Sequence, residues 1–136
     1  MLEVSASRTI PAPPEAVWAV LADPHRHVLT LPSSVSQVEV ADSGEIGCVV
    51  SAMGKSERML VRRTLLEPPR RLVEERVDGT RAGSTEFVIT PQGGGSHVTV
   101  TAQIDLPRLL AGIARGHVKH GLEQQLANLE REAAAA

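Results

Sequence analysis

Residues 106–132 form the only long stretch of this sequence with helical periodicity. At about 100° per residue, the leucines that follow Val118 fall on the same side of a helix as Val118 itself. Before Val118 that side carries small residues, and His117 flanks it. A helix of this kind needs a large apolar partner surface, which the rest of the chain must supply. We expect the second half of the helix to clamp that surface and the first half to form the lid of a ligand-sized cavity.

Alternating apolar and polar residues fill most of the remaining sequence. They predict seven strands, at residues 2–10, 35–41, 46–53, 56–67, 71–77, 80–90 and 96–105. Prolines bracket two segments after the first strand, which predicts a short helix at residues 15–21 and a second short helix or turn at 25–31. Because the later strands follow one another in hairpins, we predict an α+β fold, an antiparallel sheet with one face covered by the last helix. Residues 133–136 are predicted to fray.

Length, charge and the single cysteine limit the class of protein. A chain of 136 residues suits a single domain, spanning residues 1–136. Its 14 basic and 16 acidic residues give a formal net charge of −2, which argues against a general nucleic-acid-binding surface. No apolar run is long enough to span a bilayer, and Glu3 and alternating polar residues come soon after Met1, so we expect neither stable membrane insertion nor a signal peptide. Since Cys48 is the only cysteine, we expect no internal disulfide and a soluble cytoplasmic protein.

Three segments carry a resemblance to a known family. Residues 10–24 follow a strand with the pattern Ile-Pro-Ala-Pro-x-Glu-x-Val-Trp-x-x-Leu-x-Asp-Pro, residues 65–75 read LLEPPRRLVEE, and residues 89–107 read ITPQGGGSHVTVTAQIDLP. In these features the chain resembles the START-like (SRPBCC) superfamily and its polyketide cyclase/dehydrase-like branch. The resemblance covers the whole chain. It implies the helix-grip fold, a seven-stranded antiparallel sheet wrapped around a long C-terminal helix, with a small lipid-like or polyketide-like ligand between them.

The resemblance leaves the activity open. The superfamily includes cyclases, lipid carriers, hormone receptors and chaperone activators, and a shared fold does not transfer chemistry. Leu31 stands before Pro32, where many relatives carry an aromatic residue. The chain has one Trp, one Phe and no Tyr, so stacking on an aromatic substrate could come only from Trp18 or Phe87. This scarcity of aromatic residues fits either a codon bias or a roomy aliphatic interior.

A symmetric turn at residues 68–69 predicts which side chains of the fourth and fifth strands lie opposite one another. The predicted pairs are Val61–Arg76, Arg62–Glu75, Arg63–Glu74 and Leu65–Leu72. Side chains alternate across a sheet, and both faces of this hairpin are about equally mixed. We favour the face that holds Arg63 and Glu74 as the inner one, because the turns that follow carry its parity on to Phe87 and Val98. Two interpretations of its charges remain open. They form a salt-bridge ladder at the rim, or Glu74 holds Arg63 in place to bind a carboxylate or carbonyl oxygen of a ligand.

The histidines allow several roles. His117 is either a surface residue of the last helix or a cavity residue that binds a ligand or acts as a general base. His117 and His120 are three residues apart, but about 60° separates them around the helix and no carboxylate lies one turn away, so we predict no metal site. His25 and His27 are expected at the mouth of the cavity. Cys48 is expected to be a small buried hydrophobe.

These patterns together predict a cavity with mainly apolar walls and a few polar anchors. The predicted walls are Trp18, Leu31, Met59, Val61, Phe87, Ile89, Val100, Leu110 and Ile113, and the predicted anchors are Arg63, Glu74, Arg76 and His117. We favour binding of a small hydrophobic molecule, without a cofactor. A cyclase, dehydratase or related lyase using Arg63 or His117 remains open, as does a protein-interaction module whose gap is filled by its own side chains.

Overall fold

The structure, a computed structural model, describes residues 1–52, 54–78 and 82–135. In chain order its elements are β1 (Leu2–Ile10), α1 (Pro14–Ala22), α2 (Pro24–His27), the 3-10 helix η1 (Val28–Thr30), β2 (Val35–Val40), β3 (Ile46–Ala52), β4 (Lys55–Glu67), β5 (Arg71–Arg76), β6 (Gly83–Gln92), β7 (Gly95–Ile104) and α3 (Arg108–Ala134). All the predicted strands and helices are present, with small shifts at their ends. The parts of predicted strands at residues 53 and 80–81 lie outside the described residues. The predicted fraying is wrong at Ala133, which lies buried inside α3.

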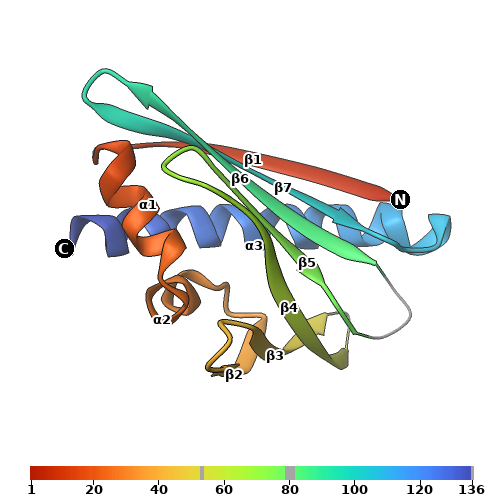
Figure 1. Cartoon of the computed structure of the whole chain (residues 1–136). Coiled ribbons are helices and arrows are strands. Elements are labelled where there is room, and N and C mark those ends of the chain that lie inside the picture. The colour runs from red at the N-terminus through yellow and green to blue at the C-terminus, as the bar shows by residue number, and fades with distance from the viewer. Residues whose placement is uncertain (53, 79–81, 136) are drawn as a thin grey trace.

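The seven strands form one antiparallel sheet in the order β1-β7-β6-β5-β4-β3-β2. The hairpins from β2 to β7 form the predicted meander, and β1 joins it by pairing with β7. In Figure 1, α3 runs along one face of this sheet, and α1 and α2 lie toward the C-terminal end of α3. We call the face that meets α3 the inner face. The arrangement is the helix-grip fold that the resemblance implies.

Alternate residues of the strands fill the inner face with apolar side chains. The buried ones from β1, β6 and β7 are Leu2, Val4, Ala6, Ile10, Phe87, Ile89, Val98, Val100 and Ala102. Leu122, Leu126 and Leu129 of α3 belong to the same core cluster. Since burying one such side chain stabilises the fold by about 1.5–3 kcal/mol, this half of α3 clamps the sheet, as predicted.

The first half of α3 is covered far less. Its small residue Ala114 is buried and Val118 packs against the core cluster, but Leu109 is 89% exposed and Ile113 is 67% exposed. His117 is also exposed. No helix in the described part of the chain is both long enough and apolar enough to cross a bilayer. The first half of α3 therefore leaves large apolar side chains exposed.

Both edges of the sheet are blocked against further strand pairing. On β1, the side chain of Arg115 donates to the carbonyl oxygen of Glu3 at 3.0 Å, and that of Lys119 donates to the carbonyl oxygen of Ser5 at 2.9 Å. On β2, a break in register accompanies Gln37, whose φ is +49°. Capped backbone groups and an irregular strand both disfavour addition of another strand, so the sheet edges are poor binding surfaces.

Candidate functional site

The β4–β5 hairpin brings two of the predicted anchors together. Three of the four predicted cross-strand pairs are confirmed, including the pair of Arg63 with Glu74. The fourth is wrong, because a break in register between Arg63 and Leu65 places Leu66 opposite Leu72. Leu72 belongs to the buried core, which identifies this as the inner face. Arg63 and Glu74 therefore face inward, whereas Leu65 turns to the outer face.

A third charged residue, His27 of α2, completes this cluster. Its Nε2 lies 2.7 Å from Oε1 of Glu74, and its side chain is only 1% exposed. The His27 ring also meets the ring of Phe87 edge-on, with centroids 5.8 Å apart. The expectation that His27 lies at a cavity mouth is wrong. Asp23 caps α2 by accepting from the backbone N–H of His25, and this fixed start turns His27 toward the sheet while His25 stays exposed.

The charges of the cluster shift the titration of its carboxyl group. Burial alone would raise the pKa of Glu74, but the charge and hydrogen bond of His27 and the charge of Arg63 together outweigh it, so the pKa lies below its ordinary value. Burial lowers the pKa of Arg63, and the charges of Glu74 and Asp23 offset this in part. A guanidinium nevertheless stays charged at neutral pH. Glu74 is therefore a buried carboxylate beside the His27 imidazole and the Arg63 guanidinium.

The guanidinium of Arg63 is only partly used by the protein. Its Nη1 donates to the carbonyl oxygen of Ala22, at the end of α1, at 2.6 Å. Among the described residues, its buried Nε and Nη2 have no hydrogen-bond partner, and neither has Nδ1 of His27. Oε1 of Glu74 also lacks a well-aligned donor, although Nε2 of His27 lies 2.7 Å from it. Nε and Nη2 are two of the donors with which an arginine holds both oxygens of a carboxylate. A buried donor without a partner costs about 1–3 kcal/mol, so this pair of donors is suited to an acceptor from outside the chain.

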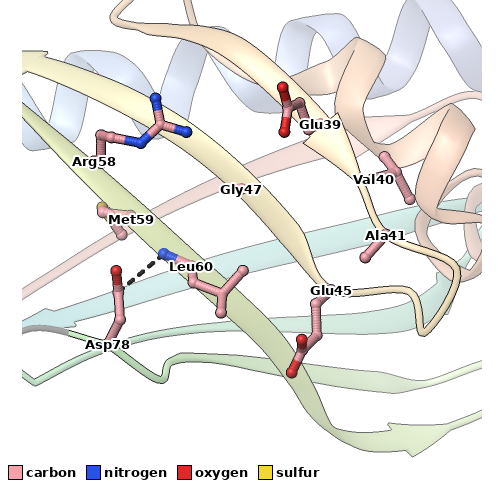
Figure 2. Close-up of a pocket in the computed structure, with 9 residues that line it drawn as sticks. All are labelled: Glu39, Val40, Ala41, Glu45, Gly47, Arg58, Met59, Leu60 and Asp78. Atoms are coloured by element: carbon pink, nitrogen blue, oxygen red, sulfur yellow. Dashed lines mark hydrogen bonds between the residues drawn. The ribbon is translucent and has the colours of Figure 1, made fainter.

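A pocket of about 250 Å³ lies beside Arg63, between the end of α1, the β2–β3 turn and β4. It is lined by Ala22, Pro24, Ser43, Gly44, Glu45, Arg62, Arg63 and Leu66. A second pocket of about 300 Å³ involves β2, β3 and β4 and includes Gly47 and Leu60 (Figure 2). Neither of these pockets includes a residue of α3. Of the predicted anchors, only Arg63 lines a pocket described here.

Arg76, another predicted anchor, contacts the start of β4. β4 begins at Lys55, and within the described part of the chain Val61 is its first residue that pairs with β5. Arg76 donates through Nη2 to the carbonyl oxygen of Arg58 at 3.2 Å and through Nε to Asp78 at 3.1 Å. Asp78 in turn accepts from the backbone N–H of Leu60, the dashed contact in Figure 2. Arg76 and Asp78 thus hold backbone groups at the start of β4.

The remaining predicted site residues separate into three groups. Phe87, Ile89 and Val100 are buried in the core, where protein side chains surround them. Trp18, Leu31, Met59, Val61 and Leu110 are half-buried, whereas Ile113 and His117 are exposed. Cys48 is buried as predicted, and burial raises the pKa of its thiol. Within the described ranges, no three side chains of the metal-binding kinds come together.

Comparison with solved structures identifies the fold independently. The structure of TTHA0849 from Thermus thermophilus matches with a TM-score of 0.79 and 28% identity, over 98% of this chain and 97% of that one. The solution structure of KanY protein matches with a TM-score of 0.84 and 16% identity, over 98% and 97% of the two chains. DR_A0006 from Deinococcus radiodurans matches with a TM-score of 0.71 and 23% identity, over 97% and 96%. No curated protein matches the sequence.

The family model described as polyketide cyclase / dehydrase and lipid transport matches residues 1–134. This match spans nearly all of the chain and agrees with the strand order, the long last helix and the short helices after β1. It also agrees with the resemblance seen in the sequence motifs. The chain therefore belongs to the polyketide cyclase/dehydrase and lipid transport family.

Proposed function

We propose that this protein binds a small, mainly apolar molecule that carries a carboxylate, and that Arg63 holds the carboxylate. The buried, unpartnered Nε and Nη2 of Arg63 are the observation that carries this proposal. A guanidinium is always charged and presents its donors in a rigid plane, which matches the two oxygens of a carboxylate. Membership of a family of cyclases, dehydrases and lipid transporters supports a small apolar ligand.

The inner face of β4 provides a path for the apolar part of such a molecule. Met59, Val61 and Arg63 alternate along one face of the strand, which advances about 3.3 Å per residue. A chain bound along them from Arg63 to Met59 spans about 13 Å. Met59, Val61 and Leu110 are only half-buried, so added apolar contacts would cover them further. An aliphatic acid of about ten carbons matches this length.

Binding of decanoic acid, measured by isothermal titration calorimetry against decanol, tests the proposal. We expect the acid to bind and the alcohol to bind at least about tenfold more weakly, because the alcohol lacks the paired acceptors. Arg63→Met should remove this preference, and Arg63→Lys should keep only part of it, because lysine retains the charge without the planar donors. Arg58→Met, a change at an exposed arginine of the same strand, is the matched control.

Two results would contradict the proposal. The first is a wild-type protein that binds neither compound or shows no preference for the acid. The second is an Arg63→Met variant that keeps its native circular dichroism spectrum and prefers the acid as strongly as the wild type. Failure to bind any small apolar molecule would favour the protein-interaction module.

A lyase is the second candidate, and the pair of His27 and Glu74 favours it. A carboxylate that holds one ring nitrogen of a histidine and leaves the other free is a general-base arrangement, and Arg63 could stabilise a developing oxyanion. The near-complete burial of His27 and the Phe87 ring against it argue for a structural role instead. Turnover of a β-hydroxy acid to an enoic acid by the wild type, abolished in His27→Gln, would establish the lyase.

A further inference from the structure

Exposed apolar side chains gather where α3 begins. Leu109 is 89% exposed, Ile113 is 67% exposed and Met1 is 75% exposed. Leu2 pairs with Ile104, so the N-terminus lies close to the start of α3, as Figure 1 shows. Leu109 and Ile113 are four residues apart and therefore neighbours on one side of the helix. Exposed apolar side chains that cluster in this way mark an interaction surface more often than a scattered set does.

The charge of this segment has one sign. Residues 106–122 contain Arg108, Arg115 and Lys119 and no acidic residue, although the whole chain has a formal net charge of −2. Arg115 and Lys119 each donate to a backbone carbonyl oxygen at the edge of β1, so their charges lie on the β1 side of the helix, next to its open face. A helix with exposed leucine and isoleucine and with basic residues beside them matches the surface of an anionic lipid layer.

The shape of this surface also favours a lipid layer over a partner protein that has a groove. Leu109 and Ile113 protrude from a convex helix, and neither of the two pockets described above includes a residue of α3. A Cβ added at Gly112 or Gly116 would meet nothing within 4 Å, so this side of α3 is open. Lipid headgroups and acyl chains can adapt to a protruding helix without a preformed complementary surface.

We infer that the first half of α3, with Leu109 and Ile113 at its centre and Arg108 beside them, docks reversibly on an anionic lipid surface. Two exposed apolar side chains and a few basic residues give interfacial binding rather than insertion. The docking surface is separate from Arg63, so this inference does not depend on the carboxylate site and can fail without it. The inference gives the protein a second partner besides the proposed ligand. This partner is a membrane surface, on which the first half of α3 would lie.

Sedimentation with vesicles tests the inference. We expect the protein to sediment with vesicles of phosphatidylcholine and phosphatidylglycerol, about tenfold more weakly with phosphatidylcholine alone, and more weakly at high salt. Leu109→Gln with Ile113→Gln should lower the partition coefficient about tenfold, and Arg108→Glu should lower it for the anionic vesicles. Leu29→Gln is the matched control, since Leu29 is 55% exposed on η1, away from the start of α3.

Three outcomes would overturn the inference. They are the absence of sedimentation with anionic vesicles, equal sedimentation of the double variant and the wild type, and an equal loss in Leu29→Gln. The single variant Leu109→Gln guards against a folding defect, because a side chain so exposed contributes little to stability. If the double variant loses its helical circular dichroism signal, the single variant decides, and unchanged binding in it overturns the inference.

Discussion

In the second half of α3, Leu122, Leu126 and Leu129 are buried against the sheet, whereas in the first half Leu109 and Ile113 face solvent. Both halves belong to one continuous helix, so the difference lies in what each half contacts. The second half follows the sequence rule that an apolar helix side needs a partner surface. The first half departs from it, with apolar residues uncovered. Departures of this kind are expected at functional surfaces, so stability should depend on one half and binding on the other.

The largest expected contrast is in stability. Leu129→Ala should lower the free energy of unfolding by about 2–5 kcal/mol, because a buried leucine leaves a cavity in the core. Leu109→Ala should change it by less than about 0.5 kcal/mol. Urea denaturation followed by circular dichroism measures both. Equal losses in the two variants would show that the halves of α3 do not differ as described.

The next largest effect concerns the contact between His27 of α2 and Glu74 of the sheet. Glu74→Gln should lower the free energy of unfolding by about 1–3 kcal/mol at neutral pH, because His27 loses a buried charged partner. Glu75→Gln, an exposed neighbour on the same strand, should have little effect and is the control. Urea denaturation measures both variants. Equally small changes in the free energy of unfolding would show that the His27–Glu74 contact does not stabilise the fold.

The same carboxyl group predicts a pH dependence. The folded pKa of Glu74 lies below its ordinary value of 4.5, so its stabilisation is fully present above that value and is lost as pH falls through the folded pKa. The wild type should therefore lose more stability than Glu74→Gln as pH falls below about 4.5. Denaturation midpoints measured for both proteins across this pH range test the prediction. Parallel curves for the two proteins would show that the His27–Glu74 pair does not cause the pH dependence.

The smallest expected effects come from the glycines. Gly112→Ala should raise the free energy of unfolding by about 0.5–1 kcal/mol, because a Cβ there meets nothing and alanine is the better helix former. Gly95→Ala, by contrast, should lower it, because its Cβ would lie 2.6 Å from the backbone oxygen of Ile10. Thermal unfolding measures both. A destabilising Gly112→Ala would mean that this side of α3 is covered.

The sequence predicted the fold well because periodicity and turns are local properties. The predicted pair of Arg63 with Glu74 is present, but the pairs nearest the turn, Glu67 with Arg71 and Leu66 with Leu72, lie one residue away from the predicted register. The break in register between Arg63 and Leu65 restores the predicted pairing beyond it, and no residue of the turn announces that break. The inner face was predicted correctly from the parity that the later turns carry on to Phe87 and Val98, because alternation alone leaves the two faces of the β4–β5 hairpin equally mixed. Alternation could not tell that Phe87 would be covered by protein side chains rather than by a ligand.

The candidate site was harder to predict because it depends on contacts between distant elements. His27 was missed because a helix of four residues is too short for periodicity to show which side faces inward. The Asp-Pro pair at residues 23–24 was the available signal, since it fixes where α2 starts. The contacts of Arg76 with the start of β4 were not foreseen, because they depend on how far β4 extends past β5. Neither fact can be read from the sequence of one element.

The central claim is that Arg63 receives the acid group of a ligand that lies along β4 toward the first half of α3. A two-dimensional ¹H–¹⁵N NMR titration with decanoic acid tests this directly, because the side-chain Nε–H of Arg63 gives its own signal. The account predicts shifts of that signal, of the amides of Met59 and Val61, and of the first half of α3, with the amides around Leu126 and Leu129 unchanged. A titration that leaves the Arg63 Nε–H signal unmoved, or that shifts the amides of Glu39, Gly47 and Leu60 but not that of Val61, would contradict it.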